Sequence, residues 1–262
     1  MSEPTILVST DARGVATVTL NRPTIHNAFD DRLIAELTGA LRHLEADAAI
    51  RVVVLTGNGQ SFSAGGDLHW MRRMAGYSDA ENFADAMGLA ELLRCLSELG
   101  KPTVARVNGA AYAGGLGLVC CCDVAVAATE AVFCVSEVRL GLVPATISPY
   151  VVAAIGGRAA RRYFLTAERF SAAEAQRLGL VHEVAPLAGL DAATDRIVGA
   201  LLDGATGAQA RSKRLVAEVQ DRPVTETLMA LTARAIAEAR ASAEAREGLA
   251  AFFDKRKPGW KR

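Results

Sequence analysis

Two glycine-rich segments of the chain contain the residue types that can hold an oxyanion. FSAGGD (residues 62–67) follows an expected strand, and NGAAYAGGLG (residues 108–117) lies between an expected strand and an expected helix. Glycines let backbone approach a ligand closely, because no side chain shields the N–H groups. Amides at a helix N-terminus also carry partial positive charge, which stabilises a developing negative charge. The two segments together predict donors to an oxyanion, although FSAGGD alone is also typical of a tight turn.

A glutamate follows the second segment at a position suited to proton transfer. Glu137 ends the apolar stretch VFCVSEV (residues 132–138), which we predict to be a strand. Burial raises the pKa of a carboxyl group towards the range that is useful for moving a proton beside a carbonyl. A glutamate that ends a strand is also commonly structural. The catalytic interpretation therefore depends on its combination with the two glycine-rich segments.

Other chemistries lack their sequence motifs. GLGLVC (residues 115–120) misses the last glycine of a dinucleotide-binding GxGxxG, and no P-loop or GxSxG motif is present. The five cysteines include no CxxC pair and no adjacent histidine, so we expect small buried hydrophobic residues rather than a metal or redox site. The 29 basic and 29 acidic side chains balance, which argues against nucleic acid or an anionic membrane as a partner bound through bulk charge.

The elements that position these residues alternate along the chain. We expect strands at residues 5–10, 15–20, 51–56, 103–107 and 124–128, the first two as a hairpin. We expect helices from Asp30 or Asp31 with Leu33, Leu37, Leu41 and Leu44 on one face, at residues 81–99, and near residues 116–121. Alternation of strands with helices favours a layered α/β fold over a helical bundle.

The pattern changes in the last third of the chain. Ser171 and Glu174 match a capping box for a helix that ends at Gly179, and residues 180–184 are expected to form a last short strand. Beyond residue 187 all segments are expected to be helical, with residues 225–253 as one long helix or a pair. We therefore predict a catalytic core at residues 1–187 and a helical oligomerisation region at residues 188–262.

Neither a secretion signal nor a membrane span is expected. The N-terminus MSEPTILVSTDARG lacks a basic region followed by an apolar one. The longest uncharged stretches, residues 108–122 and 140–157, are interrupted by Gly, Pro, Ser or Asn. We therefore expect a cytoplasmic protein.

In this order and spacing, the motifs resemble the crotonase family of enoyl-CoA hydratases and isomerases. The likeness covers nearly the whole chain and rests mainly on FSAGGD, on the NG, GG and CD pairs between residues 108 and 123, and on FFDKRK at residues 252–257. It implies a spiral of ββα units with a C-terminal helical trimerisation region, assembled as a homotrimer or homohexamer. It also implies an acyl-CoA substrate, with no cofactor beyond the CoA that the substrate carries.

The resemblance implies roles for particular residues. The backbone amides of Gly66 and Gly114 would hold the thioester oxygen of the substrate, and Glu137 would move the proton. The residues implied for substrate binding are Asn27, Ala64, Asp67, Leu68, Trp70, Gly117, Phe252 and Lys255.

These substrate-binding residues would act in different ways. Asn27 and its neighbours would line the CoA nucleotide, whereas Lys255 and Phe252 would reach it from an adjacent subunit. A lysine in this tail is equally typical of a solvated charge.

His69 and Trp70 follow FSAGGD closely and are candidates to face the acyl group, although a packed aromatic ring and an exposed histidine are the commoner outcome there. We expect Asp67 to fix its loop rather than to take protons.

The chain departs from the family at Gly117. Typical enoyl-CoA hydratases have a first glutamate at this position and a second one that matches Glu137. A single glutamate leaves two interpretations, a hydratase or a Δ3,Δ2-enoyl-CoA isomerase. Residues 114–123 and 136–150 resemble bacterial hydratases of branched glutaconyl-CoA substrates, such as 3-methylglutaconyl-CoA and isohexenylglutaconyl-CoA, so we favour such a hydratase.

A glutaconyl substrate carries a carboxylate of its own. The sequence suggests both space for this group and a basic side chain to pair with it. We expect Gly117 to make room for that end of the substrate and to avoid like-charge repulsion with it. Arg72 and Arg73 are candidates to pair with the carboxylate, and adjacent residues of a helix point in different directions, so at least one should be solvated.

A function of another class also follows from the resemblance. One family relative binds RNA, and a degraded site would leave a protein that only binds acyl-CoA or acts as a scaffold. The neutral charge argues against RNA. The presence of Glu137 with both glycine-rich segments argues against an inactive protein.

Overall fold

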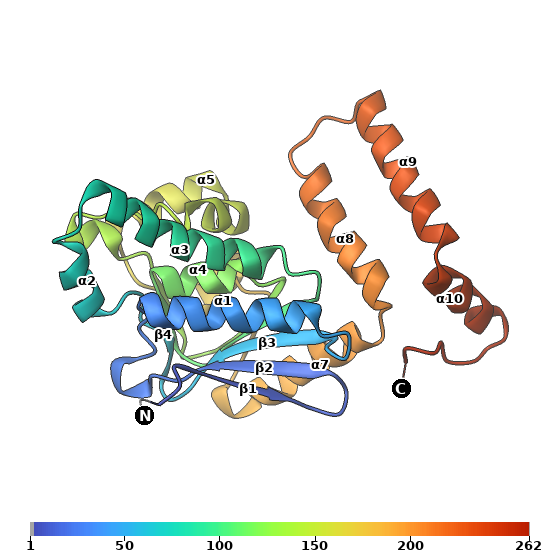
Figure 1. Cartoon of the computed structure of the whole chain (residues 1–262), viewed down its shortest axis with the longest axis horizontal. Coiled ribbons are helices and arrows are strands. Elements are labelled where there is room, and N and C mark those ends of the chain that lie inside the picture. Colours follow the sequence, from blue (N-terminus) through green and yellow to red (C-terminus); the bar gives the residue numbers. More distant parts are fainter. Residues whose placement is uncertain (1–2, 262) are drawn as a thin grey trace.

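A mostly parallel sheet, with an antiparallel hairpin at one edge, forms the centre of the fold (Figure 1). The computed structural model describes residues 3–261. Within them the strand order is β1-β2-β3-β5-β7-β10, with β1 and β2 antiparallel and the other pairs parallel. The strands are β1 (Ile6–Thr10), β2 (Val15–Leu20), β3 (Val52–Gly57), β5 (Thr103–Val107), β7 (Val124–Ala128) and β10 (Glu183–Ala185). The expected hairpin and the α/β class are confirmed.

A second, smaller sheet carries the order β4-β6-β8-β9. Its strands are β4 (Ser61–Ser63), β6 (Ala110–Tyr112), β8 (Val132–Cys134) and β9 (Phe170–Ser171). Each of the first three directly follows a strand of the larger sheet, and each pair of strands is followed by a helix. This repeat of two strands and a helix is the ββα spiral expected from the family resemblance. Because each repeat adds one parallel strand to each sheet, equivalent loops of successive repeats become neighbours.

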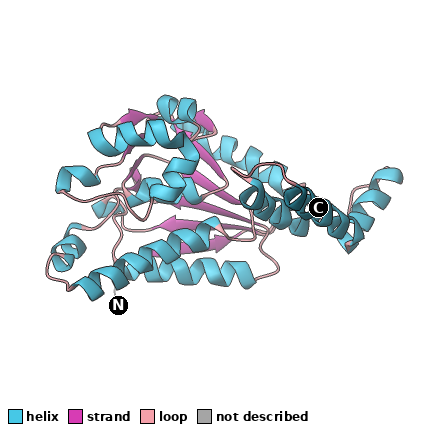
Figure 2. Ribbon diagram, turned by 90° about the horizontal axis from the view of Figure 1, so that it is seen from above, coloured by secondary structure: helices cyan, strands magenta, loops and turns pink. Residues whose placement is uncertain are grey.

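Seven helices of the described chain cover these sheets (Figures 1 and 2). They are α1 (Asp31–Ala46), α2 (Leu68–Met74), α3 (Asp79–Ser97), α4 (Gly114–Cys121), α5 (Ser148–Thr166), α6 (Ala172–Leu178) and α7 (Leu190–Leu202). Short 3-10 helices span Pro23–Ile25, Glu137–Leu140 and Leu187–Gly189. Helix α1 packs on α3, α3 on α4 and α4 on α5, whereas α7 contacts β3, β5 and β7.

Local capping explains where several helices begin. Asp30 caps α1 by accepting a hydrogen bond from the amide of Leu33 at 3.0 Å. Helix α3 begins at Asp79, two residues before the expected start, because Ser78 and Glu81 form a complete capping box. At α6 only half of the expected box forms. Ser171 accepts from the amide of Glu174, but the Glu174 carboxylate bonds to Tyr163 and Arg177.

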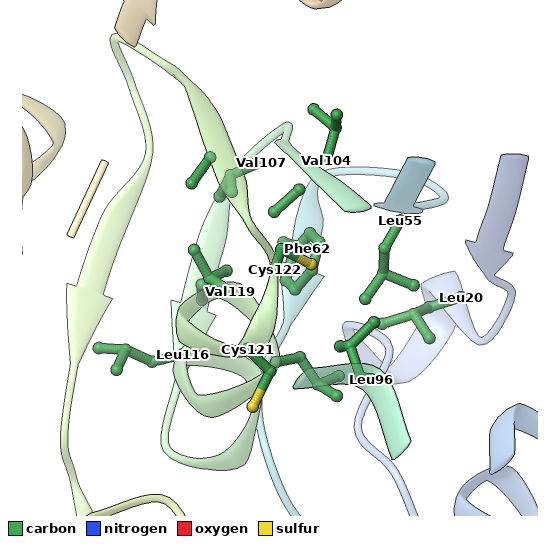
Figure 3. Packing of buried hydrophobic residues seen from close by; sticks show 14 of the residues in the cluster. Leu20, Leu55, Phe62, Leu96, Val104, Val107, Leu116, Val119, Cys121 and Cys122 are labelled. Atoms are coloured by element: carbon green, nitrogen blue, oxygen red, sulfur yellow. The ribbon is translucent and has the colours of Figure 1, made fainter. Parts of the chain in front are cut away.

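The hydrophobic core lies between the helices and the larger sheet (Figure 3). The four leucines expected on one face of α1 are all buried there. Cys121 and Cys122 pack in the same core, and Cys134 is also buried. Burial raises the pKa of the Cys120 thiol to about 12, so it stays protonated at neutral pH. The expectation that the cysteines act as small hydrophobic residues is confirmed for these positions.

The last three helices stand away from the two sheets (Figures 1 and 2). They are α8 (Thr206–Val219), α9 (Glu226–Ala241) and α10 (Ala243–Phe253), and the break at Ser242 makes the expected pair out of residues 225–253. Helix α7 buries Leu190 and Val198 against the core. The helices that leave the core therefore begin at α8 rather than at residue 188.

Two basic side chains tie this C-terminal region to the core. Arg51, beside β3, donates to the carbonyl oxygens of Leu202, Gly204 and Trp260 at 2.8–2.9 Å. Lys213 of α8 forms a 2.9 Å ion pair with Asp123. In the part of the chain that is described, no helix has the length and apolar character needed to cross a bilayer.

Candidate active site

Three loops that follow β4, β6 and β8 meet at one cavity of about 740 Å³. The strands are parallel neighbours, so their carboxyl ends lie at the same edge of the small sheet. Gly66 lies three residues beyond β4, Gly114 two residues beyond β6, and Glu137 three residues beyond β8. All three residues line the cavity. The structure thus brings together the residues that the sequence suggested for holding an oxyanion and moving a proton.

The amides of Gly66 and Gly114 are available to a ligand. Within residues 3–261 neither N–H has an acceptor in the protein, although the adjacent Asp67 amide donates to the Phe29 carbonyl oxygen at 3.0 Å. Ala113 precedes α4 with φ of 49°, a conformation that is costly for a residue with a side chain. Its own amide donates to the Cys134 carbonyl oxygen at 2.8 Å, which secures that turn. The Gly114 amide therefore begins the helix in a fixed position.

Close packing explains why residue 114 must be glycine. A Cβ atom there would lie 2.2 Å from Cζ of Phe29. The Phe29 ring is almost completely buried and forms part of the cavity wall. Any side chain at position 114 would displace the ring, so glycine is needed both for the exposed amide and for the wall behind it.

Glu137 has the environment of a proton-transfer group. The residue begins a 3-10 helix, and β8 ends three residues earlier, so the expected strand through residue 138 is wrong. Burial raises the pKa of its carboxyl group above the ordinary value, although hydrogen bonds from the backbone amides of Glu137 and Ser136 partly oppose the shift. Its Oε2 atom is buried and has no hydrogen-bond partner within the described residues. Such an oxygen is free to exchange a proton with a bound molecule.

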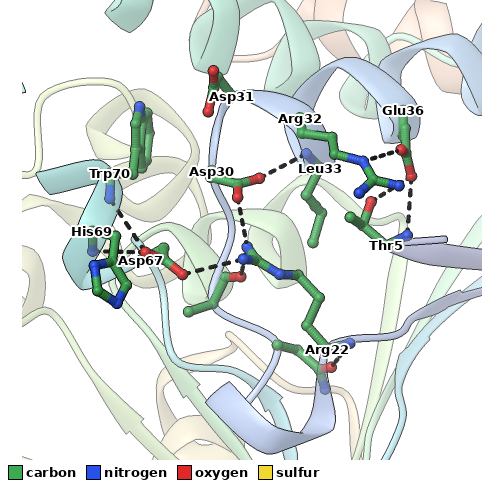
Figure 4. A network of polar contacts seen from close by, with 12 residues as sticks. Thr5, Arg22, Asp30, Asp31, Arg32, Leu33, Glu36, Asp67, His69 and Trp70 are labelled. Carbon is green, nitrogen blue, oxygen red and sulfur yellow. Dashed lines mark hydrogen bonds and ion pairs between the residues drawn. The ribbon is translucent and has the colours of Figure 1, made fainter. Parts of the chain in front are cut away.

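Asp67 fixes the loop beside Gly66 (Figure 4). Its carboxylate accepts from the amides of His69 and Trp70 at 2.7 and 3.2 Å, which caps α2, and it pairs with Arg22 at 3.2 Å. Burial raises the pKa of Asp67, but these amides and the Arg22 charge outweigh that effect and hold it below the ordinary value. Arg22 also pairs with Asp30 at 3.1 Å. Asp67 is therefore a positioning residue, as expected, and its carboxylate is not turned to a substrate.

One side of the cavity is formed by α2, α3 and the loop after Glu137. Leu68 and Trp70 line it, as expected, together with apolar side chains that include Leu142 and Val143. The Trp70 indole is held by a 3.0 Å hydrogen bond from Nε1 to Asp85. Aliphatic and aromatic walls of this kind suit a short acyl chain.

Asn27 does not have the expected role, and the role of Ala64 stays a prediction. Asn27 is completely buried, and its side-chain nitrogen donates to the carbonyl oxygens of Asn58 and Ser61, each at 2.8 Å. The expectation that this side chain lines a nucleotide is wrong, because its oxygen accepts from the Arg22 amide and its nitrogen already has two carbonyl partners. The amide of Ala64 donates to the His26 carbonyl oxygen, and the residue lies outside the cavity lining.

The space beside Gly117 is filled. A Cβ atom at position 117 would lie 2.3 Å from Cγ2 of Ile147, which is 1% exposed and lines the cavity. The expectation that Gly117 makes room for a substrate carboxylate is therefore wrong. Ile147 is thirty residues away in the sequence, and no local pattern predicts that it packs against α4.

Phe252 lies in α10 and Lys255 follows it, and this helix stands away from the two sheets (Figure 1). Both are exposed, Phe252 by 76%, and neither lines the cavity of its own chain. Their expected contact with a substrate stays a prediction about an adjacent subunit.

Two free amides and a carboxylate with a buried, unpartnered oxygen line one cavity on a repeated ββα fold, an arrangement that can polarise a carbonyl group and move a proton next to it. The chain belongs to the enoyl-CoA hydratase/isomerase family, whose model matches residues 10–262. This confirms the crotonase resemblance. It also establishes the class of enzyme, an enoyl-CoA hydratase/isomerase acting on acyl-CoA.

Solved structures of similar proteins agree with this assignment. An enoyl-CoA hydratase from Shewanella pealeana is 44% identical, with a TM-score of 0.95 over 98% of this chain and 96% of that one. An enoyl-CoA hydratase from Mycobacterium smegmatis is 34% identical, with a TM-score of 0.93 over 99% and 100%. The Pseudomonas aeruginosa protein AtuE is 36% identical, with a TM-score of 0.94 over 99% and 100%.

The contact between Gly117 and Ile147 leads to a prediction about stability. Gly117→Ala is expected to lower the free energy of unfolding by about 1–3 kcal/mol, because the new methyl group overpacks the core. The double variant Gly117→Ala/Ile147→Ala should lose less than the sum of the two single variants. Urea denaturation at a fixed protein concentration measures each value.

Gly39→Ala is the matched control, because Gly39 lies within α1 with open space where its Cβ would be. This variant should be neutral or more stable by up to about 1 kcal/mol. A Gly117→Ala protein as stable as the wild type would show that the side chain of Ile147 gives way without cost.

Proposed function

We propose that the protein hydrates the double bond of a branched glutaconyl-type enoyl-CoA, such as 3-methylglutaconyl-CoA, through a thioester enolate. The observation that carries this proposal is the buried, unpartnered Oε2 of Glu137 in the same cavity as the free amides of Gly66 and Gly114. CoA enters as part of the substrate, so the proposal includes no separate cofactor.

The two amides would hold the thioester oxygen while negative charge develops on it. Donors that are already in place stabilise that charge without reorganisation, which is the main advantage of such a site. The ionised Glu137 takes a proton from water as the hydroxyl group adds to the β-carbon. The electron pair of the double bond moves to give the enolate, whose oxygen is held by Gly66 and Gly114.

Glu137 then returns its proton to the α-carbon, and the carbonyl forms again. The hydroxyl group and the proton of one water molecule have been added to adjacent carbons, and the carboxylate is restored. Because the same group takes and returns the proton, one glutamate is sufficient if both additions occur on the face of the substrate that Glu137 contacts. This mechanism suits a chain that has Gly117 and Ile147 where a second glutamate would be needed.

The choice of a glutaconyl acyl group rests on sequence likeness and on the shape of the cavity. Residues 114–123 and 136–150 resemble those of branched glutaconyl-CoA hydratases. The second stretch forms the loop that contributes Leu140, Leu142 and Val143 to the cavity wall. Apolar side chains there suit a methyl branch on the acyl chain.

A Δ3,Δ2-enoyl-CoA isomerase is the second candidate. Isomerisation requires one group to remove a proton from C2 and return it to C4, and Glu137 alone is sufficient for this. The observation that favours it is the arrangement at the cavity's other carboxylate, Asp85, which accepts a hydrogen bond from the Trp70 indole. This bond engages one oxygen of Asp85 with the indole, whereas Oε2 of Glu137 has no partner within the described residues.

We also propose that the chain assembles as a homotrimer or homohexamer through α8, α9 and α10. These helices stand away from the core, and their apolar side chains are exposed. The exposed residues are Val216, Met229, Ile236, Leu249, Phe252 and Phe253. Burying them against a second copy would stabilise the assembly and would bring Phe252 and Lys255 to a neighbouring chain.

Replacing Glu137 tests the mechanism. Glu137→Gln keeps the shape of the side chain and removes proton transfer, so kcat for hydration should fall by about 10²–10⁴-fold. The affinity for unreactive butyryl-CoA should stay within about twofold of the wild type, because the two amides are unaffected. Near-wild-type turnover with unchanged affinity would contradict the role of Glu137.

The wild-type pH profile is the companion measurement. Hydration needs ionised Glu137 in the free enzyme, so kcat/KM should decline as pH falls through the pKa of this group. Since burial raises that pKa, the decline should begin above the pH range of an ordinary glutamate. A profile that is flat down to the range of an exposed glutamate would contradict the assignment.

Substrate comparison separates the proposed activity from its alternative. We expect kcat/KM for 3-methylglutaconyl-CoA to exceed that for crotonyl-CoA by about tenfold or more. A site that binds the terminal carboxylate of a substrate discriminates against substrates that lack this carboxylate. A preference for crotonyl-CoA would reject the proposed substrate. Conversion of a 3-enoyl-CoA to a 2-enoyl-CoA without hydration of either glutaconyl or crotonyl thioesters would identify the isomerase.

The assembly is tested by light scattering during size-exclusion chromatography at micromolar concentration. We expect a mass of three or six chains, each of 27.5 kDa. Ile236→Asp should shift the mass towards the single chain, because a charge on the exposed face of α9 would be buried without a partner. A wild-type protein with the mass of one chain would refute the proposed assembly.

A further inference from the structure

Two adjacent arginines of α2 have different environments. Arg73 turns to α1 and forms a 2.5 Å ion pair with Asp31. Arg72 is exposed to solvent and contributes to the cavity lining, and within residues 3–261 it forms no hydrogen bond or ion pair. Successive residues of a helix point about 100° apart, which allows one arginine to serve the surface while the other reaches the cavity. The sequence could not distinguish the two, and the structure does.

Arg72 is the one basic side chain among the described residues that line the cavity. The acidic side chains of the lining are Glu137 and Asp85. Glu137 begins the 3-10 helix after β8, and Asp85 accepts a hydrogen bond from the Trp70 indole. Neither carboxylate forms an ion pair with Arg72. Most of the remaining wall is apolar. A guanidinium without a partner in these surroundings is positioned for an anionic group of a ligand.

The position of α2 indicates which part of the ligand this group would be. Gly66 directly precedes the cap of α2, and Arg72 lies one helical turn beyond Leu68, about 6 Å further along the axis. A thioester held at the Gly66 amide would therefore have its acyl chain, rather than its carbonyl group, near this turn of the helix. Leu68 and Trp70, which come from the same helix, line the acyl side as well.

We propose that Arg72 binds a carboxylate at the far end of the acyl chain and so determines specificity for dicarboxylic acyl-CoA thioesters. This inference rests on the proposed function, and it names the residue that selects the substrate. The guanidinium matches a carboxylate with two parallel hydrogen bonds, which a neutral acyl end cannot accept. Arg72 takes the role that Gly117 cannot have, because Ile147 fills the space beside that glycine.

The test measures binding of two unreactive saturated thioesters by titration calorimetry. Glutaryl-CoA has a terminal carboxylate, and butyryl-CoA has a methyl end. Arg72→Met keeps much of the aliphatic length and removes the charge. We expect it to weaken binding of glutaryl-CoA by about 10- to 100-fold and to leave butyryl-CoA within about twofold. Arg72→Lys, which keeps a point charge without the planar fork, should be intermediate.

Arg73→Met is the matched control, since it removes a neighbouring charge that is already paired outside the cavity. It should leave the affinities for both thioesters unchanged. Equal weakening of glutaryl-CoA and butyryl-CoA in Arg72→Met would overturn the proposal, because Arg72 would then bind the common CoA portion. Unchanged affinity for glutaryl-CoA in Arg72→Met would overturn it as well.

Binding and turnover distinguish this inference from the proposed function. If the wild type does not hydrate 3-methylglutaconyl-CoA but its selectivity for glutaryl-CoA disappears in Arg72→Met, the proposed reaction fails and the role of Arg72 stands. If the wild type hydrates 3-methylglutaconyl-CoA with the same kcat/KM in Arg72→Met, the reaction stands and the role of Arg72 fails. A wild type that binds butyryl-CoA more tightly than glutaryl-CoA would also overturn the inference.

Discussion

The parallel pairing of β4, β6 and β8 is the constraint on which the site depends. Hydrogen bonding aligns Ala111 with Ser63 on one side, and with Phe133 on the other, so the three strands end at one edge. Each short strand is one part of a repeated unit, and the loop after it contributes one functional group. Gly66, Gly114 and Glu137 are therefore neighbours because the repeats stack, although they are far apart in the sequence. A cavity of about 740 Å³ lies at this edge and is lined by all three residues.

The glycines of α4 show how packing and chemistry share one helix. A Cβ at Gly114 would strike the ring of Phe29, and one at Gly117 would strike Ile147. The first glycine leaves an amide open to a ligand, whereas the second lets a core side chain approach the helix. Glycine is thus needed at position 114 to expose an amide and at position 117 to allow close packing. The loss of a glutamate at position 117 consequently changes the wall of the cavity, because the branched side chain of Ile147 fills the space that a carboxylate would need.

Two carboxylates near the cavity are driven in opposite directions by their surroundings. Asp67 is buried, but two backbone amides and Arg22 stabilise its charge, so its pKa is lowered and it holds the loop. Glu137 is desolvated without a charged partner, so its pKa is raised and it can exchange a proton. Separation of pKa values in this way assigns the two groups their roles. Arg72, which forms no ion pair within the described residues, adds a third electrostatic feature to the lining of the cavity.

The sequence by itself determined the class of fold, most of the elements, and the group of residues that the structure brings to one cavity. Alternating apolar residues, helix caps and glycine-rich turns act within a few residues of each other, so their effects can be recognised locally. The tertiary structure decided that Asn27 is a buried support, that Ile147 closes the space at Gly117, and which of two arginines faces the cavity. These outcomes depend on contacts between distant segments, whose close packing is set by the whole fold and leaves no periodic pattern in the chain.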